Sequence, residues 1–255
     1  MTTPLVLLET PTEATAIVTL NRPDRRNALS IELMESLCRT LRKLAAEPSR
    51  RAVILCGAGP AFCAGLDLIE AADGRQAERS AELIADCLRT LMDSPLVTIA
   101  AVHGAAYAGG VGLLAGCDFV VASDDVTVCC PEVRRGLVPA LISIVLRQRL
   151  CESDLRELLL VAEPMDAAKV LEIGLVNRVV PREELLPEAR SLAESILRGA
   201  PEAVRQTKRL LRRFDDAELT RQFQQALEAH KQARQHDEAR EGLAAFQEHR
   251  PPRWQ

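Results

Sequence analysis

The sequence has no apolar stretch long enough to cross a membrane. Its longer apolar stretches, such as Leu96–Val102 and Val111–Ala115, are far shorter than the roughly 20 residues that a membrane-spanning helix needs. The first residues also lack the basic patch, apolar run and small-residue cleavage site of a secretory signal. We therefore expect a protein that has no membrane partner and stays in the cytoplasm.

The cysteine spacing gives no sign of a metal site or a disulfide framework. The eight cysteines are scattered singly, apart from Cys129 and Cys130, and no pair has the C-x-x-C spacing of zinc or redox sites. We interpret them as reduced, mostly buried small apolar residues. No metal is expected.

The charged residues form no extended basic face for nucleic acid. The formal net charge is −4, and residues of both signs are interspersed along the chain. A local basic run at Lys208–Arg213 is interpreted as the solvated face of a helix. Nucleic acid is therefore not an expected partner.

The first half of the chain alternates strand patterns with helical patterns, which predicts an α/β domain. Short runs rich in β-branched residues predict strands at Ala16–Leu20, Ala52–Cys56, Val97–Val102 and Phe119–Ala122. Apolar periodicity predicts helices at Ser30–Ala46, with Ser30 as the N-cap, and at Gln76–Met92.

Helix formers dominate the chain from Ala140 onward. Helices are predicted at Leu141–Leu150, Asp154–Ala162, Asp166–Ile173, Glu183–Arg198, Pro201–Phe214 and Ala217–His249, and Leu175–Val180 looks extended. We find no internal repeat or flexible linker. The prediction is one domain, with an α/β core over residues 1–195 and a helical C-terminal extension over residues 196–255 that packs on the core or on a neighbouring subunit.

Two glycine-bearing segments follow predicted strands. Gly57–Asp67 (GAGPAFCAGLD) follows the strand ending at Cys56, and Gly104–Gly112 (GAAYAGGVG) follows the strand ending at Val102. Because glycine lacks a Cβ, the backbone N–H groups of such loops can approach a ligand closely. Two loops of this kind can direct two N–H donors at one oxygen and so form an oxyanion hole. Glycines that serve only turns and close packing are the alternative.

A weaker match is to the dinucleotide-binding fingerprint G-x-G-x-x-A. Gly110, Gly112 and Ala115 fit it, and Glu132 lies 20 residues after Gly112, near where an acid that binds ribose is expected. However, seven residues separate Val102 from Gly110, which is too many for the tight first turn of that fold. We therefore favour the oxyanion interpretation.

Taken together, several motifs resemble the enoyl-CoA hydratase/isomerase (crotonase) family over nearly the whole chain. They are NRPDRRNAL at Asn21–Leu29, GPAFCAGLDL at Gly59–Leu68, AVHGAAYAGGVGLLAGCDFVVAS at Ala101–Ser123, PEVRRGLVP at Pro131–Pro139, AKVLEIGLVNRV at Ala168–Val179 and EGLAAFQEHRPPRW at Glu241–Trp254. The resemblance implies a crotonase-like (ClpP/crotonase) α/β fold with a repeated ββα core. It also implies an acyl-CoA thioester substrate, in which coenzyme A is part of the substrate rather than a cofactor.

The resemblance assigns roles to individual residues. The N–H groups of Leu66 and Gly109 would bind the thioester oxygen, and Ala64 would lie against the adenine of coenzyme A. The other coenzyme A-binding residues that it implies are Gly110, Phe246 and an arginine near the phosphates, which is Arg26 or its neighbour Arg25. A plain surface charge at Arg26 and a core contact at Phe246 are the alternatives. A homotrimer or a hexamer built from two trimers is expected, with residues 196–255 serving trimerisation or covering the site.

One of the two glutamates that family hydratases use is absent here. The first position, five residues before Cys117, is Gly112, and the second is Glu132. Addition of water needs both a base and an acid, whereas one carboxylate can move a proton from the α carbon to the γ carbon. Glu132 alone therefore favours enoyl-CoA isomerisation. The alternatives are hydration, with any second acid supplied from elsewhere, and a catalytically idle acyl-CoA-binding homologue.

The neighbours of Glu132 leave its protonation open. Pairing with Arg134 would lower the pKa of the carboxyl, whereas burial among Val133 and Leu137 would raise it.

Outside the proposed site, Asp67 is expected to cap a helix, Asp118 to be structural and His103 to be a hydrogen-bonded structural histidine.

Overall fold

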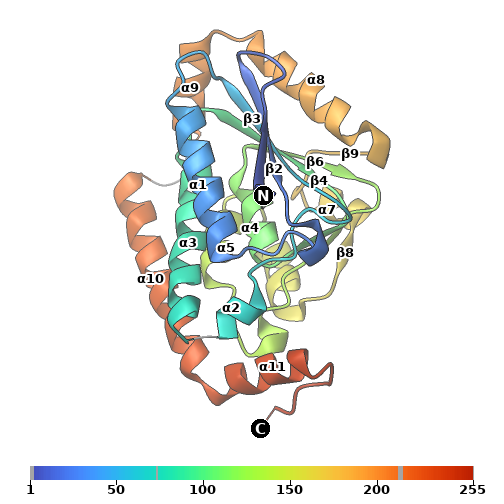
Figure 1. Ribbon diagram of the computed structural model, residues 1–255, viewed down its shortest axis with the longest axis vertical. Coiled ribbons are helices and arrows are strands. Elements are labelled where there is room, and N and C mark those ends of the chain that lie inside the picture. The colour runs from blue at the N-terminus through green and yellow to red at the C-terminus, as the bar shows by residue number, and fades with distance from the viewer. Residues whose placement is uncertain (1–2, 73, 212–214, 255) are drawn as a thin grey trace.

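The computed structural model describes residues 3–72, 74–211 and 215–254 (Figure 1). It has a six-stranded sheet with the order β1-β2-β3-β4-β6-β9 and a three-stranded sheet with the order β5-β7-β8. The strands are β1 (Val6–Glu9), β2 (Thr15–Leu20), β3 (Ala52–Gly57), β4 (Val97–Val102), β5 (Ala105–Tyr107), β6 (Phe119–Ser123), β7 (Thr127–Cys129), β8 (Met165–Asp166) and β9 (Arg178–Val180).

Helices surround these sheets and make up most of the second half of the chain. In the first half they are η1 (Pro23–Arg25), α1 (Ile31–Ala45), α2 (Leu68–Ala72), α3 (Gly74–Met92), α4 (Gly109–Gly116) and η2 (Val133–Arg135). They continue with α5 (Ala140–Leu146), α6 (Glu152–Arg156), the π-helical turn η3 (Glu157–Val161), α7 (Ala167–Glu172), η4 (Arg182–Glu184), α8 (Leu185–Leu197), α9 (Pro201–Leu210), α10 (Asp216–Gln235) and α11 (Asp237–Gln247). Within the described residues, no helix is long and apolar enough to span a membrane.

Parallel pairing in the main sheet brings the two glycine loops together. All four strands predicted from β-branched runs are present, and β3 pairs in parallel with both β2 and β4. Every residue of β4 is buried, as expected for a parallel strand covered on both faces. Since β3 and β4 run in the same direction, the loops that follow them start at the same edge of the sheet.

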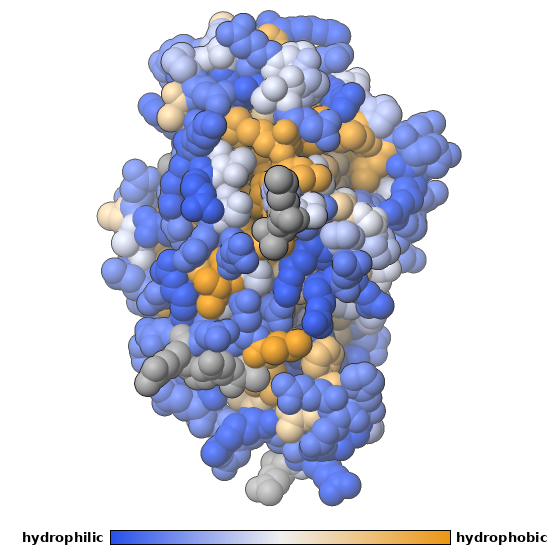
Figure 2. All heavy atoms as spheres, in the orientation of Figure 1, coloured by the Kyte–Doolittle hydropathy of each residue, from blue (hydrophilic) through white to orange (hydrophobic). Residues whose placement is uncertain are grey.

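Helices cover both faces of the main sheet (Figure 1). The larger apolar cluster includes residues of α1, α3, α4 and α5, and the smaller one joins the sheet to α8 through Leu185 and Leu192. Figure 2 shows hydrophilic side chains over most of one face, with apolar side chains gathered in its upper half, where Figure 1 places the strands.

The start of α1 follows the predicted capping. The Ser30 side chain accepts a hydrogen bond from the backbone N–H of Leu33 at 3.3 Å, which confirms Ser30 as the N-cap. Leu33, Leu37 and Leu41 then form the buried face of the helix. The helix ends at Ala45, shortly before Pro48.

The prediction of one continuous helix over Ala217–His249 was wrong. The chain becomes extended at His236, which separates α10 from α11. α10 packs against α3 and α5, while α11 turns to lie against η2. Two glycines make this contact possible, because they have no Cβ. A Cβ on Gly136 would lie 2.2 Å from the Glu238 carbonyl oxygen, and one on Gly242 would lie 2.2 Å from the Arg135 carbonyl oxygen.

Other predictions of local structure differ in detail. Neither β1 nor the smaller sheet was predicted. The strands of the smaller sheet have two or three residues and are too short to display alternation. The predicted helix over Asp154–Ala162 is α6 followed by the π-helical turn η3. Part of the helix predicted at Pro201–Phe214 lies outside the described residues, because residues 212–214 are not among them.

Candidate active site

Backbone hydrogen bonds join the two glycine loops directly. The N–H of Cys63 donates to the Ala105 carbonyl at 3.1 Å, and the N–H of Tyr107 donates to the Cys63 carbonyl at 2.9 Å. The loops can approach this closely because Gly110 has no Cβ. A Cβ at this position would lie only 2.3 Å from the Cys63 carbonyl oxygen. Glycine at position 110 therefore serves loop packing.

The backbone around Leu66 leaves its own N–H available. Leu29 donates to the Gly65 carbonyl at 2.8 Å and accepts from the Asp67 N–H at 3.1 Å. Leu29 and Leu66 therefore form a parallel β-bridge. In such a bridge the residues on either side of Leu66 make the hydrogen bonds to Leu29, so the N–H of Leu66 points away from Leu29. Within the described part of the chain, this amide donates to no backbone carbonyl.

The N–H of Gly109 is the second available donor. Gly109 is the first residue of α4, where amides have no partner inside the helix. The preceding residue, Ala108, has φ 49° and ψ −117°, a conformation that L residues rarely adopt. Such backbone strain is found preferentially at functional sites. A Cβ on Gly65 would lie 3.3 Å from the Gly109 nitrogen, so the two loops touch where these amides lie.

A cavity of about 60 Å³ contains Leu66, Gly109 and Glu132 in its walls. Residues of α10 and of the segment before α5 complete the lining, which also includes Ala64, Leu68, Ile84, Ala108, Arg135, Leu137, Val138, Pro139, Ala140, Leu141, Ile142, His230 and Arg234. The Oε2 atom of Glu132 is shielded from solvent and has no hydrogen-bond partner among the described residues. The structure thus brings the predicted carboxylate and the predicted amides to one space.

Burial determines the protonation of Glu132. It raises the pKa of the carboxyl to about 7, and the hydrogen bond from the Glu132 backbone N–H and the charge of Arg135 only partly oppose this rise. Arg134 does not pair with Glu132; it donates to the Val161 carbonyl at 2.9 Å and to Glu163 at 3.3 Å. Of the two opposing influences considered from the sequence, burial prevails.

The position of the absent second acid leaves no room for a side chain. A Cβ on Gly112 would lie 2.7 Å from Cγ2 of Ile142 and 3.1 Å from Cδ2 of Leu88. Among the described residues that line the cavity, Glu132 is the only carboxylate. An acid introduced at position 112 would therefore have to displace the core.

Gly112→Ala is expected to be less stable than Gly116→Ala by about 1–3 kcal/mol, because only the first overpacks the core. Both glycines lie in α4, so the gain in helix propensity is similar for the two variants. A Cβ on Gly116 would meet nothing closer than 3.6 Å. Urea unfolding of the two variants measures the difference, and equal unfolding free energies would contradict this packing.

The segment that includes Arg26 holds the first glycine loop in place. The N–H of Ala64 donates to the Arg26 carbonyl at 3.0 Å, and the Arg26 residue itself is exposed. Beside it, the amide of the fully buried Asn27 donates to the carbonyls of Ala58 and Ala61 at 2.9 and 2.8 Å. The sequence had not singled out Asn27 for this role.

Phe246 is not among the described residues that line the cavity, and much of its side chain is exposed. It is 45% exposed, and the guanidinium of Arg135 lies 4.3 Å from the centre of its ring. This cation–π contact links α11 to the segment that bears Glu132.

The sequence missed His230 and Arg234, which extend from α10 to the cavity. Their spacing of four residues puts them on one face of the helix. Burial, aided by the charge of Arg234, lowers the pKa of His230 to about 4. Burial also lowers the pKa of Arg234. The helical spacing indicated a shared face, but it could not reveal which cavity that face meets.

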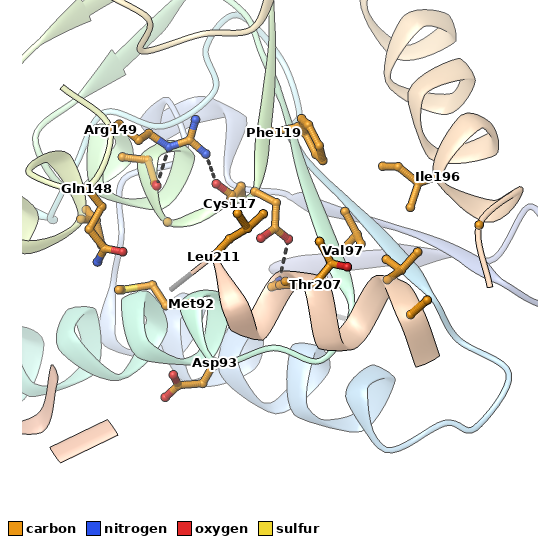
Figure 3. A pocket seen from close by; sticks show the side chains of 18 of the residues that line it. Met92, Asp93, Val97, Cys117, Phe119, Gln148, Arg149, Ile196, Thr207 and Leu211 are labelled. Carbon is orange, nitrogen blue, oxygen red and sulfur yellow. Dashed lines mark hydrogen bonds and ion pairs between the residues drawn. The ribbon is translucent and has the colours of Figure 1, made fainter. Parts of the chain in front are cut away.

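A larger cavity of about 670 Å³ lies between α9 and the end of α4 (Figure 3). Its charged groups are paired: Lys208 donates to Asp118 at 2.6 Å and to the Leu96 carbonyl at 2.7 Å, and Arg149 donates to the carbonyls of Ala115 and Cys117. Asp118 therefore has the expected structural role, and the prediction of a solvated Lys208 was wrong. We place the active site in the smaller cavity, where a buried carboxyl lacks a partner.

The remaining polar predictions describe structural residues. Asp67 accepts a hydrogen bond from the Ile69 N–H at 3.0 Å in the first turn of α2, which confirms its capping role, and it also pairs with Arg22 at 2.6 Å. Nε2 of His103 is bonded to the Gly59 carbonyl at 3.0 Å, as expected of a structural histidine. No group of three or more potential metal ligands occurs within the ranges that the structure describes.

Comparisons with known proteins agree with this architecture. The sequence model of the enoyl-CoA hydratase/isomerase family matches residues 10–255. A Thermus thermophilus protein, described provisionally as an enoyl-CoA hydratase, is 39% identical over 94% of this chain and 96% of its own length. Mevalonyl-coenzyme A hydratase of Aspergillus fumigatus is 33% identical, covering 97% of this chain and 94% of that protein.

Solved structures show the same relationship. An enoyl-CoA hydratase from Mycobacterium avium superposes with a TM-score of 0.87 at 33% identity, over 100% of both chains. The fold is therefore the crotonase-like fold that the motifs predicted, and the chain belongs to the enoyl-CoA hydratase/isomerase family.

Proposed function

We propose that the protein binds an acyl-CoA thioester and moves protons on the carbons next to the thioester, with Glu132 as the proton carrier. One observation carries the proposal: a carboxyl with a raised pKa lines the same cavity as two available backbone amides. A pKa near the working pH suits a group that must both accept and return a proton.

The amides of Leu66 and Gly109 form the oxyanion hole in this proposal. Removal of a proton from the α carbon places negative charge on the thioester oxygen, which both N–H groups can stabilise. A well-aimed donor of this kind contributes about 3–4 kcal/mol. The strained Ala108 supports the assignment, because its conformation sets the direction of the following amide.

Double-bond isomerisation is the reaction that this single carboxylate favours. Glu132 takes a proton from the α carbon of a 3-enoyl-CoA, the electrons delocalise as a dienolate, and the same carboxyl returns the proton to the γ carbon. The double bond moves from the 3 position to the 2 position, and no second acid is required.

Assays with 3-enoyl-CoA and 2-enoyl-CoA, run side by side, test this proposal. We expect turnover of the 3-enoyl thioester to be the faster reaction. Faster turnover of the 2-enoyl thioester, with uptake of water, would defeat the isomerase assignment.

The kcat/KM for isomerisation is expected to rise as the pH increases through about 7. Glu132 must be ionised to accept the α proton, and burial raises its pKa to about 7. The other charged or titratable groups in the cavity do not produce this step: His230 has a pKa of about 4, and Arg135 and Arg234 stay protonated. A profile measured from about pH 5 to about pH 9 should show the rise, and a flat profile would exclude Glu132 as the base.

Hydration of a 2-enoyl-CoA is a second candidate function. The specific observation in its favour is that the relatives reported above carry hydratase names. The same pair of substrates decides between the two reactions.

Coenzyme A binding and self-association complete the proposal. We place the adenine beside Ala64 and the phosphates near the exposed Arg26.

Leu210 and Leu211, at the end of α9, are 85% and 76% exposed, and a partner subunit in a trimer or hexamer would cover such apolar side chains. Light scattering in solution gives the number of subunits.

A further inference from the structure

The cavity beside Glu132 contains a second polar atom without a partner. His230 is 8% exposed, and its Nε2 atom has no hydrogen bond among the described residues. Among the described residues, only four buried side-chain atoms share this condition, and two of them, Nε2 of His230 and Oε2 of Glu132, belong to residues that line the same cavity. Isomerisation by Glu132 alone gives this histidine no role.

The hydrogen bond on the other side of the ring determines what Nε2 can do. The backbone carbonyl of Val138 acts on the ring as a hydrogen-bonding group that raises its pKa, and we assign this interaction to Nδ1 because Nε2 has no partner. A carbonyl only accepts, so Nδ1 carries the proton and the neutral ring presents a lone pair at Nε2. Burial keeps the ring neutral by lowering its pKa to about 4.

Two acceptor atoms without partners therefore line the cavity when Glu132 is ionised. Two acceptors cannot satisfy each other, and a buried polar atom left without a partner destabilises the folded state. A water molecule has two O–H groups and needs about 10–15 Å³. The cavity volume of about 60 Å³ is sufficient for it.

We propose that Nε2 of His230 and the carboxylate of Glu132 hold a water molecule between them, so that the protein also adds water reversibly to a 2-enoyl-CoA. His230 then occupies the functional place of the absent second carboxylate. This inference rests on the proposed oxyanion hole and on Glu132 as proton carrier.

The proposed step balances with the groups present. The water oxygen bonds to the β carbon, one water proton passes to the Glu132 carboxylate, and the electrons of the double bond pass to the thioester oxygen. The Glu132 carboxyl then gives that proton to the α carbon. The second water proton stays on the new hydroxyl, which remains hydrogen-bonded to Nε2 of His230. The imidazole orients the water and is not protonated.

Substitution of His230 tests the inference through the ratio of the two reactions. His230→Leu keeps a similar volume but removes the acceptor, so we expect kcat/KM for hydration to fall by about 10²-fold. Isomerisation needs no water and is expected to fall by less than about fivefold. His230→Gln supplies an amide oxygen as acceptor and should recover about tenfold of the hydration rate. Incorporation of ¹⁸O from labelled water into the product hydroxyl measures hydration directly.

His236→Leu is the matched control. It makes the same substitution at an exposed position at the end of α10, and both reactions should match those of the natural protein. Thermal unfolding of each variant reports folding. If His230→Leu does not fold, the recovery test moves to His230→Gln and His230→Met, of which only glutamine offers an acceptor.

The outcomes separate this inference from the proposed function. Natural protein that isomerises but incorporates no ¹⁸O refutes the water site and leaves the isomerase proposal standing. An equal loss of both reactions in a folded His230→Leu variant also refutes it, because a purely structural role has that effect. Absence of both reactions in the natural protein overturns the proposed function itself.

Discussion

Replacement of Glu132 by glutamine is expected to lower kcat/KM by about 10³-fold for isomerisation, and for hydration if hydration occurs. The amide has a similar shape but cannot accept or return a proton, and a positioned acid or base contributes about 10²–10⁴ in rate. Steady-state assays with both enoyl-CoA substrates measure the loss. An unchanged trace activity would indicate the idle acyl-CoA-binding homologue.

The same variant is expected to be more stable than the natural protein at pH 8, by about 1–2 kcal/mol. Burial raises the folded-state pKa of Glu132 from 4.5 to about 7, so between these values the folded state holds a proton that the unfolded chain releases. The natural protein therefore loses stability as the pH rises through this window, whereas glutamine has no charge to bury.

Urea unfolding at pH 5 and pH 8 measures this effect. The control is Glu163→Gln, which neutralises a carboxylate that is 70% exposed and pairs with Arg134; its effect should be small. If Glu132→Gln is no more stable than the natural protein at pH 8, the carboxyl is not held in a desolvated place.

Substitution of Gly65 by alanine is expected to lower kcat by about 10²–10³-fold, as the loss of one oxyanion donor does. A Cβ there would lie 2.8 Å from the Tyr107 carbonyl oxygen and 2.9 Å from the Ala108 Cβ. The two glycine loops would have to separate, which moves the Leu66 amide away from the Gly109 amide. KM should change less than kcat, because the two N–H groups matter most when charge develops on the oxygen.

Gly174→Ala is a matched control for this substitution. Gly174 also has positive φ, +75° compared with +89° for Gly65, but a Cβ there meets nothing within 4 Å. Both variants suffer similar backbone strain, whereas only Gly65→Ala separates the loops. If both lose activity equally, or if Gly65→Ala keeps its kcat, the two amides do not act together on one oxygen.

The parts of the site that come from neighbouring segments were predictable from the sequence. Buried β-branched runs identified β3 and β4, and parallel pairing places the loops that follow them side by side. Glycines at 65 and 110 indicated a close backbone approach, and the structure shows the contacts that a Cβ would make there. The catalytic roles of Leu66, Gly109 and Glu132 remain predictions, although all three residues line one cavity.

Features that depend on distant packing were not predictable. His230 and Arg234 line the cavity with Glu132 because α10 lies across α5, and the helical segment breaks at His236, just beyond them. The sequence around His236 is polar and continues the helical pattern, so it gave no sign of this break. The direction of the Glu132 pKa shift was equally hidden, since it depends on whether Arg134 turns toward the carboxyl or toward Val161.

The packing of α10 over the cavity has a consequence for the chemistry. Desolvation, rather than a fixed charge, keeps Glu132 close to half-protonated near neutral pH, and part of that desolvation comes from a helix near the other end of the chain. Any motion that lifts this helix would admit bulk solvent and return the group to an ordinary surface acid. The proton affinity of Glu132 thus depends on how closely α10 packs over the cavity.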